Sequence, residues 1–481
     1  MLLPGFRGTS LPDWLRARLE SGLAGVCLFA ENIASSPGPA GRDDGEPDSD
    51  ARLAALTGEI RAANPAAVVA IDEEGGDVTR LAAATGSPYP GNAVLGRLDD
   101  PTLTAAVACA VAARLAAGGV TLNFAPVADI NSNPLNPVIG VRSFGASAEL
   151  VARHVTAWTA AHEKAGVATS VKHFPGHGDV AVDSHHDLPV LDIDLDLLRS
   201  RELRPFAAAI AAGARTVMTS HIVVRPVDPT GPATFSAAVL QGLLRDELGF
   251  SGVIVSDALD MRGASGTIGI PAAAVSALAA GVDLLCLGTR TTEEQLSAIE
   301  SAIVAAVESG ALPAERLREA AARVAALAAT GPAASGGHRP DGRPQTTDLP
   351  GPDRIAEAFD VRPGAVPPPG ARIVQIETTA NMAVGRIPWG LAAAGVAVEQ
   401  VRPGDPLPPG PLVLVGKDNH RHPLVCDMID KARDAGPTLV VDMGWPGPDR
   451  AYADVATFGA SRAVGIALQR WLVAHGLERA R

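Results

Sequence analysis

Short apolar runs and longer helical patterns alternate over the first 330 residues of the chain. In the longer stretches Ala and Leu recur at the spacing of a helix face, as in 103–117, 149–165 and 237–248. A short, continuously apolar run between turn residues is typical of a strand that is buried on both faces. The pattern predicts seven such strands, at 24–29, 67–72, 120–124, 167–171, 215–219, 252–256 and 282–287.

Strands that alternate with helices indicate a parallel sheet. At this length a closed (β/α)8-type TIM barrel is the favoured architecture, and we expect it to occupy residues 1–335. An eighth strand is not obvious in the pattern, which leaves an irregular barrel as the alternative.

A second, smaller domain is expected after a change in composition. Residues 336–370 are rich in Pro and Gly and read as a linker. Apolar runs then return at 372–376, 396–401, 412–416 and 438–442, with helical patterns at 422–435 and 461–475. We expect residues 371–481 to form an α/β sandwich domain with a mostly parallel sheet.

Polar and titratable residues follow five of the predicted barrel strands. They are Asp72-Glu-Glu-Gly-Gly, Asp129, Lys172-His173, Ser220-His221 and Asp257. The carboxyl ends of barrel strands form the active-site rim of this architecture, so we expect these residues to meet there. The polar run at 417–422 in the second domain is interpreted as a solvated loop, which places the expected chemistry in the barrel.

The loop from Lys172 to Pro189 carries four His, three Asp and one Lys. His173 and His177 have the spacing of a helical metal-ligand pair, but Pro175-Gly176 between them prevents that helix, so no metal site is predicted. We expect His177 to be structural. A carboxylate two residues from a histidine can accept its ring N–H and raise its basicity, so Asp183-Ser-His185 makes His185 a candidate proton shuttle.

Three further residues have competing interpretations. Asp257, at the end of a strand, is a candidate nucleophile, base or metal ligand, or alternatively a helix N-cap. We expect Asp72 to face the pocket and accept hydrogen bonds from hydroxyls, with Arg80 supporting it. Arg142 is a candidate pocket residue or a surface ion-pair partner.

Composition and charge narrow the classes of partner and compartment. The net charge of -13 and the absence of a basic stripe argue against nucleic-acid binding and predict little attraction to anionic membranes. No run of eighteen apolar residues and no signal-peptide pattern is found. The cysteines lie at Cys27, Cys109, Cys286 and Cys426 among apolar neighbours and read as buried free thiols, which together favours a cytoplasmic protein.

Several of these motifs together resemble a known family. Lys172-His-Phe-Pro-Gly-His-Gly-Asp followed by Asp183-Ser-His185 closely resembles the signature loop of family 3 glycoside hydrolases, in the β-N-acetylglucosaminidase branch. Asp72-Glu-Glu-Gly-Gly with Arg80, the segment 123–129, Arg142-Ser-Phe and the segment 250–257 are similar in the same order. Glu73 stands where relatives often carry Gln or His. The resemblance covers roughly residues 4–330, and 370–481 resembles the optional second domain.

The resemblance implies a retaining exo-β-N-acetylglucosaminidase that needs no metal and no organic cofactor. Asp257 would be the nucleophile and His185, paired with Asp183, the general acid/base. The sugar hydroxyls and the N-acetyl group would be held by Asp72, Arg80, Arg142, Lys172 and His173. The implied substrate is a β-N-acetylglucosaminide or a muropeptide, with a role in cell-wall recycling. The alternatives are an N-acetylglucosaminide phosphorylase with the same residues and a non-catalytic sugar-binding protein.

Overall fold

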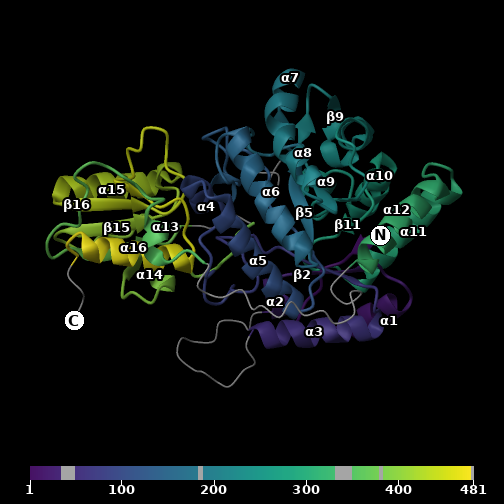
Figure 1. Ribbon diagram of the computed structural model, residues 1–481, viewed down its shortest axis with the longest axis horizontal. Helices are drawn as coiled ribbons and strands as arrows, with labels where there is room; N and C mark the ends of the chain where they lie inside the picture. Colours follow the sequence, from purple (N-terminus) through teal and green to yellow (C-terminus); the bar gives the residue numbers. More distant parts are fainter. Residues whose placement is uncertain (34–48, 183–187, 331–348, 379–382, 478–481) are drawn as a thin grey trace.

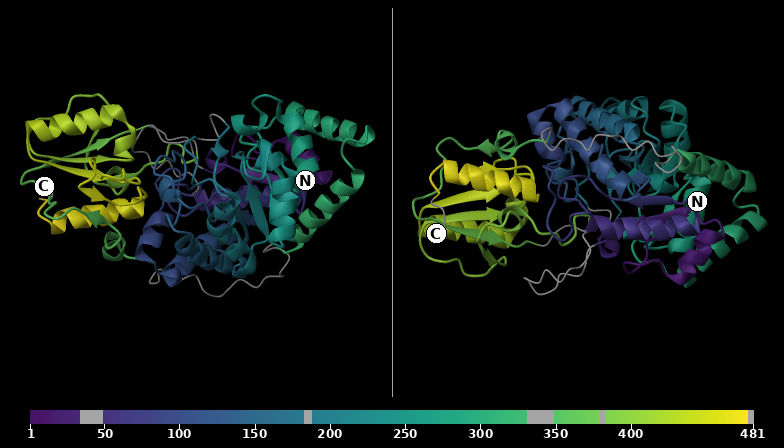
Figure 2. Two further views of the ribbon diagram at one scale, coloured as in Figure 1. Left: turned by 90° about the horizontal axis from the view of Figure 1, so that it is seen from above. Right: turned by 60° about the horizontal axis from the view of Figure 1, so that its bottom comes forward.

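The computed structural model describes residues 1–33, 49–182, 188–330, 349–378 and 383–477. The chain forms two bodies side by side along the long axis of the molecule, a larger barrel and a smaller α/β domain (Figure 1). The same division is visible in both rotated views (Figure 2). The predicted fold class, a TIM barrel followed by an α/β sandwich, is confirmed.

The barrel is built from parallel strands that correspond to the seven predicted runs and one more. The strands are β1 Leu2–Leu3, β2 Gly25–Leu28, β3 Val68–Ile71, β4 Leu122–Asn123, β5 Ala168–Phe174, β7 Thr216–Thr219, β10 Val253–Val255 and β11 Leu285–Cys286. Hydrogen-bonded neighbours run in the order β2, β3, β4, β5, β7, β10.

The strand that the sequence did not reveal closes the barrel. β1 pairs with β11, and the bridge between Val255 and Leu284 joins β11 to β10. On its other side, the Cys27 N–H donates to the Pro4 carbonyl at 3.1 Å, which links β1 to β2. The apolar run around β1 ends at Pro4 after three residues, whereas the equally short strands β4 and β11 lie within longer apolar runs, so β1 could not be recognised from the pattern.

Helices follow the barrel strands and cover their outer faces. They are α1 Asp13–Glu20, α2 Ala30–Ile33, α3 Ser49–Ala63, α4 Asn92–Leu98, α5 Pro101–Ala117, α6 Ala148–Lys164, α7 Leu195–Leu197, α8 Leu203–Ala211, α9 Arg262–Ser265, α10 Ile270–Ala280, α11 Glu293–Glu308 and α12 Ala314–Ala329. Two 3-10 helices are η1 Gly140–Arg142 and η3 Ala233–Phe235, and two π-helices are η2 Leu198–Glu202 and η4 Ala238–Glu247. A small separate sheet is formed by β6 Val190–Leu191, β8 Val223–Val224 and β9 Asp228–Pro232.

Alternation along each strand explains why the barrel strands are apolar throughout. On β3, Val68 and Ala70 pack in one core cluster with Leu122, Ala168 and Val253 of other strands, whereas Val69 and Ile71 belong to the cluster that contains the helices. Both faces are therefore buried, as expected of a parallel barrel. Because apolar side chains fill the interior of the barrel, its polar residues gather at the carboxyl ends of the strands.

The second domain is a three-layer α/β sandwich. Its sheet has the order β12, β17, β16, β15, β13, β14, with only β12 antiparallel to its neighbour. The helix α15 packs on one face, and α13, α14 and α16 pack on the other. The elements are α13 Pro352–Ala356, β12 Asp360–Val361, β13 Arg372–Ile376, α14 Gly390–Ala393, β14 Glu399–Val401, β15 Leu412–Gly416, η6 Asn419–Arg421, α15 Pro423–Ala435, β16 Thr438–Asp442, β17 Val455–Ala456 and α16 Arg462–Ala474.

Part of the range predicted as a linker is folded. Ile355, Ala358 and Phe359 are buried in the core of the second domain, and β12 adds a strand to its sheet. The Pro- and Gly-rich composition hid these residues, because Pro352 opens the helix α13 rather than breaking one. The folded second domain therefore begins before residue 371.

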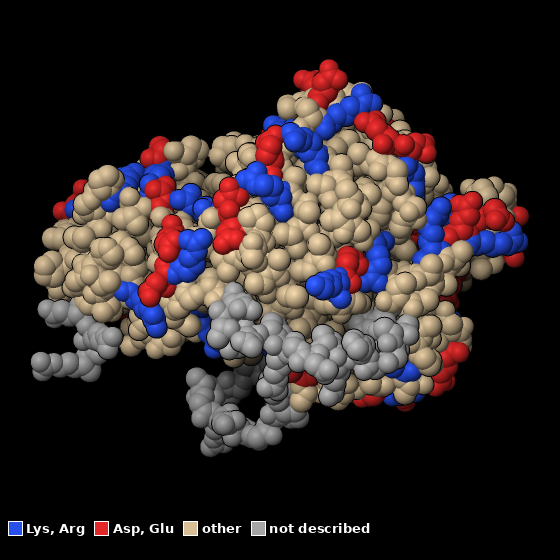
Figure 3. Space-filling view, in the orientation of Figure 1, with Lys and Arg blue, Asp and Glu red and all other residues tan. Residues whose placement is uncertain are grey.

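The surface carries charges of both signs. Acidic and basic side chains are interspersed on the face shown in Figure 3, without a continuous basic patch. The cysteines are free, but only Cys27 and Cys286 are buried, so the prediction of a buried thiol was wrong for Cys109, which is exposed, and for Cys426, which is half-buried. Among the described helices, none has the length and apolar character that a membrane crossing requires.

Candidate active site

A cavity of about 750 Å³ opens at the carboxyl ends of the barrel strands. Side chains from the end region of seven strands line it: Phe29, Asp72, Phe124, Lys172, Met218, Asp257 and Cys286. Residues 383–387 of the second domain form part of its wall. The volume falls within the range of small-molecule binding sites, so this is the candidate active site.

A buried network of charges lies at one side of the cavity. Lys172 Nζ donates to Asp72 Oδ1 at 2.7 Å and lies 2.7 Å from Glu74 Oε1. Arg142 donates two hydrogen bonds to the same Glu74 carboxylate, from Nε at 3.0 Å and from an Nη at 2.8 Å. Arg80 lies 3.8 Å from the other Asp72 oxygen. The network thus presents a fixed array of donors and acceptors to a polar ligand.

Mutual pairing keeps these buried groups charged. Burial alone would raise the pKa of Glu74, but the Arg142 and Lys172 charges outweigh it and hold the pKa below its ordinary value. Burial alone would lower the pKa of Lys172, and the neighbouring Asp72 and Glu74 instead raise it. Arg142 is buried rather than on the surface, so its alternative as a surface ion pair is wrong.

The loop after β3 presents two of its three consecutive acids to the cavity. Asp72 and Glu74 line it, whereas the Glu73 side chain turns away and accepts hydrogen bonds from Thr79 Oγ1 at 2.9 Å, Arg80 N at 2.8 Å and Leu81 N at 3.0 Å. Gly75 then takes a φ of 76°, a left-handed conformation that favours glycine. The loop doubles back on Glu73, which fixes Asp72, Glu74 and Arg80 on the cavity side.

A second buried carboxylate orients two histidines, His173 near the end of β5 and His177 just after it. Asp129 accepts the His173 and His177 backbone N–H groups at 3.1 and 2.7 Å through Oδ1, and Oδ2 lies 2.6 Å from His173 Nδ1. Burial alone would raise the pKa of Asp129, but the histidines lower it. With Nδ1 engaged, Nε2 is the ring nitrogen of His173 left for a ligand in the cavity. Burial lowers the pKa of His177 to about 4, which suits a structural role.

Asp257 lies in the same cavity, directly after β10. Its Oδ1 accepts the Ala258 N–H at 2.7 Å, which orients the carboxylate. The alternative of a helix N-cap does not match the structure, because the next helix, α9, begins at Arg262. A carboxylate held at a strand end beside a polar array has the placement that a nucleophile or base requires.

The structure brings together six of the eight residues proposed from the sequence. Asp72, Arg80, Arg142, Lys172, His173 and Asp257 all line the cavity. Asp183 and His185 lie outside the described residues. Sequence reasoning missed Glu74 and the orienting role of Asp129. The available signals were the i, i+2 spacing of Asp72 and Glu74 after a strand and the position of Asp129 beyond β4.

Three arginines line the outer part of the cavity, and they differ in whether an acidic partner neutralises them. Arg290 pairs with Glu31 at 3.3 Å. Arg262 follows the Asp257 loop and Arg386 comes from the second domain, and both are exposed. No acidic partner of Arg262 or Arg386 lies within ion-pair distance in the described part of the chain. Two guanidinium groups are therefore available at the cavity's outer edge.

Comparison with known proteins identifies similar glycosidases. The sequence is 34% identical to β-hexosaminidase A of Pseudoalteromonas piscicida over 66% of this chain, and the match spans 55% of that relative's length. It is 36% identical to a β-hexosaminidase of Stenotrophomonas maltophilia over 62% of this chain and 87% of that one. The fold matches a glycoside hydrolase family 3 β-N-acetylglucosaminidase from Paenibacillus with a TM-score of 0.83 and 30% identity, covering all of this chain and 96% of the other.

The family assignment follows from the extent of the match and from the barrel that it covers. Residues 20–327, nearly the whole barrel, match the family described as "Glycosyl hydrolase family 3 N terminal domain". The chain therefore belongs to glycosyl hydrolase family 3.

Proposed function

We propose that this protein is a retaining exo-β-N-acetylglucosaminidase, with Asp257 as the nucleophile and His185, paired with Asp183, as the general acid/base. The observation that carries the proposal is the placement of Asp257 in one cavity with the buried array of Asp72, Glu74 and Lys172. The names of the relatives, β-hexosaminidase and β-N-acetylglucosaminidase, support the choice of sugar.

In the first half of the proposed reaction, an Asp257 oxygen attacks the anomeric carbon while His185 gives its proton to the departing glycosidic oxygen. The bond from the anomeric carbon to the aglycone breaks, and a glycosyl ester on Asp257 forms. In the second half, His185 takes a proton from water as the water oxygen replaces Asp257. Two inversions give net retention of configuration.

The paired network suits recognition of sugar hydroxyls. The Asp72 carboxylate accepts hydrogen bonds from hydroxyls, while Lys172 and Arg80 hold it in place. His173, fixed by Asp129, offers Nε2 to the sugar or its N-acetyl group. Because these groups are positioned before the substrate arrives, they lose little conformational entropy on binding.

The state of the buried cations favours water over phosphate as the acceptor. A phosphorylase must attract a phosphate dianion to the glycosyl-enzyme. Lys172 and Arg142 are buried in ion pairs with Glu74, so neither leaves an uncompensated charge deep in the cavity. Hydrolysis is therefore the proposed reaction, and a phosphorylase or a non-catalytic sugar-binding protein is the alternative to be tested.

Arg262 and Arg386 bear on the leaving group. Exposed guanidinium groups without an acidic partner attract carboxylates from solution. We therefore propose an aglycone that carries a carboxylate, as muropeptides do, and a cytoplasmic role in cell-wall recycling.

Turnover of p-nitrophenyl β-N-acetylglucosaminide, beside the glucoside and the xyloside, tests the sugar. The proposal is supported if the N-acetylglucosaminide is cleaved in preference to the other two substrates. NMR should then show that the N-acetylglucosamine released first has the β configuration. An α-configured first product would exclude the retaining mechanism. Release of sugar 1-phosphate as the main product in phosphate buffer would establish a phosphorylase, and binding without turnover would establish a sugar-binding protein.

A further inference from the structure

We propose that Lys417 of the second domain is a positioning residue, which acts through Asp77 to hold the segment 72–80 of the barrel in its ligand-binding geometry. The reading of 72–80 as a sugar-binding segment rests on the proposed function. The second domain would then take part in the chemistry of a site whose catalytic residues all lie in the barrel.

Asp77 sits within the segment that supplies Asp72, Glu74 and Arg80 to the active-site cavity. It does not line that cavity. Its side chain is only 4% exposed and lines a neighbouring cavity of about 410 Å³ between the two domains. One carboxylate oxygen pairs with Lys417 Nζ, and the other accepts the Ala460 N–H at 2.9 Å. Asp77 thus faces the second domain while its neighbours face the sugar site.

Lys417 lies at the interface between the domains and not in a solvated loop, so the interpretation of 417–422 was wrong, and Lys417 is held firmly on its own side. It follows β15, and the next two residues, Asp418 and Asn419, donate their backbone N–H groups to Asp442 at 2.8 and 3.1 Å. Burial alone would lower the pKa of Lys417, but Asp77 and Asp418 raise it, so the ammonium group stays charged. A fixed, charged lysine is suited to hold a carboxylate in one place.

A further contact ties the same segment to the second domain. An Arg80 Nη donates to the Ala383 carbonyl at 3.2 Å and lies 3.8 Å from Asp72. The segment is therefore anchored to the second domain on both sides of Val78, which itself lines the active-site cavity. A shift of either anchor moves the groups that line the cavity.

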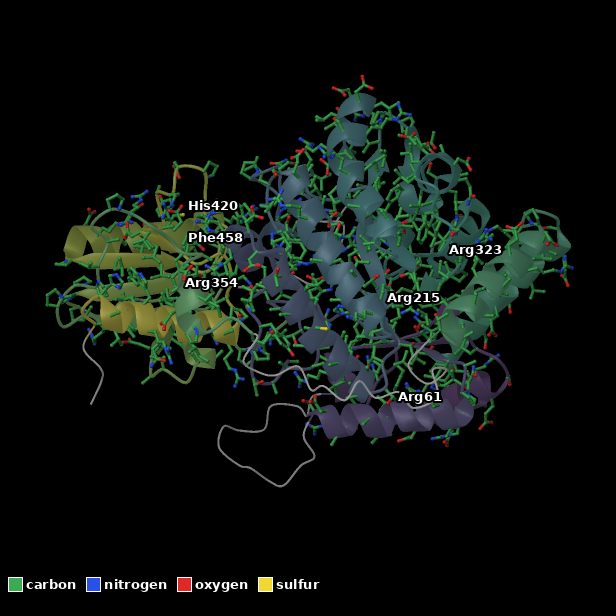
Figure 4. The ribbon with its side chains drawn as sticks, viewed as in Figure 1. Arg61, Arg215, Arg323, Arg354, His420 and Phe458 are labelled. Carbon is green, nitrogen blue, oxygen red and sulfur yellow. The ribbon has the colours of Figure 1, made fainter. Side chains whose placement is uncertain are left out.

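Docking of the two domains does not depend on Lys417 alone. Ala93 of α4 packs with Ala453, Ala456 and Phe458 of the second domain, beside Val141 and Trp445. The Arg97 guanidinium lies over the Phe458 ring, 4.1 Å from its centre. Figure 4 shows Phe458 and His420 on the side of the second domain that faces the barrel. This apolar contact keeps the domains together when one ion pair is removed.

The chain provides a matched control for the test. Arg421, four residues after Lys417, also crosses the interface, where it donates to the Pro134 and Leu135 carbonyls at 2.8 and 3.1 Å. Within the part of the chain that the structure describes, Arg421 makes no hydrogen bond or ion pair with the segment 72–80. Arg421→Gln therefore removes an interdomain contact of the same loop without touching the proposed anchor.

The experiment compares Lys417→Met, Lys417→Arg and Arg421→Gln in the full-length protein. Lys417→Met should lower kcat/KM for p-nitrophenyl β-N-acetylglucosaminide by about tenfold or more and weaken N-acetylglucosamine binding, since small displacements of positioning groups are costly. Lys417→Arg should recover most of the loss, and Arg421→Gln should stay within about twofold of the wild type.

Hydrogen–deuterium exchange gives a readout that does not need activity. Amides of 72–80 should exchange faster in Lys417→Met than in the wild type and Arg421→Gln. Equal exchange in all three proteins, or equal losses of kcat/KM in Lys417→Met and Arg421→Gln, would overturn the proposal. A wild-type protein without hexosaminidase activity would instead refute the proposed function, and the exchange comparison would still decide the role of Lys417.

Discussion

Both parallel sheets of this protein carry polar side chains at the carboxyl ends of their strands, but they use them differently. In the barrel, Asp72, Lys172 and Asp257 meet around one cavity. In the second domain, Asp442 at the end of β16 binds backbone N–H groups of the neighbouring loop, and Lys417 after β15 pairs with the barrel. A closed sheet turns all its strand ends toward a common axis, whereas an open sheet sets them in a row. Closure of the sheet is thus what converts separate polar strand ends into a site.

The largest expected effect tests the nucleophile. Asp257→Ala should lower kcat for p-nitrophenyl β-N-acetylglucosaminide by on the order of 10⁴-fold or more, because no covalent intermediate can form. The control is Glu377→Gln, which changes the carboxylate that follows β13 in the open sheet and should leave kcat within about threefold. A 5-fluoro glycosyl fluoride should label Asp257. Labelling of a different carboxylate would show that the nucleophile lies elsewhere.

The next effect tests the proposed acid/base. His185→Ala should slow substrates with poor leaving groups by roughly 10²–10⁴-fold, because the departing oxygen is no longer protonated. Activated aryl glycosides should suffer far less, and Asp183→Asn should show the same pattern in a milder form. The measurement is kcat/KM across a series of leaving groups of rising pKa. Equal losses across the series would contradict the role.

The third effect is the loss of unfolding free energy when an ion pair is broken, compared between a buried pair in the barrel and an exposed pair in the second domain. Glu74→Gln leaves Arg142 and Lys172 without their shared carboxylate and should cost about 3 kcal/mol of unfolding free energy. Asp353→Asn in the second domain removes a partner of Arg470 in an exposed pair and should cost about 1 kcal/mol or less. Urea unfolding measures both. Similar costs would mean that burial does not set the worth of these pairs.

The smallest effect, taken per pH unit, is a change in the pH dependence of stability. An unfolded histidine takes up a proton near pH 6.5, whereas burial lowers the pKa of His177 in the folded protein to about 4. Between these values the unfolded chain binds more protons, so the stability that neutral His177 contributes is lost as the pH falls from 6.5 to 4. In His177→Gln the fall in unfolding free energy should be shallower by up to about 1.4 kcal/mol per pH unit. An unchanged slope would exclude His177 as a source of acid sensitivity.

The sequence predicted elements that have a period or a run long enough to detect. The strands β13, β15 and β16 lie at the expected residues, and six of the seven predicted barrel strands lie within the expected runs. The exception is β5, which continues to Phe174, so Lys172 and His173 belong to a strand and not to the predicted loop. The short strands β1, β12 and β17 were missed because, unlike β4 and β11, they do not lie within a longer apolar run, and pairing with distant strands defines them.

Site residues that directly follow a predicted strand could be predicted from the sequence. Residues whose place in the site depends on side-chain direction or on domain docking could not. Asp72, Lys172 and Asp257 end or follow the strands predicted from the sequence, so the barrel architecture alone directed them to one rim. Glu74 was missed because three consecutive acids do not reveal which side chains alternate toward the cavity. The wall at 383–387 could not be predicted, because it depends on how the second domain docks.

Closure of the barrel by β1 has a consequence for the order of folding. Leu2 and Leu3 pair with Leu285 and Cys286, residues at the far end of the barrel sequence. During synthesis the first strand emerges long before its partner, so the ring cannot be completed until the last barrel strand has left the ribosome. Contacts of such large sequence separation carry a high entropic cost of loop closure and slow folding. The open edges of β1 and β10 would persist over that interval, and a nascent chain stalled before residue 285 should therefore be a preferred client of chaperones that shield strand edges.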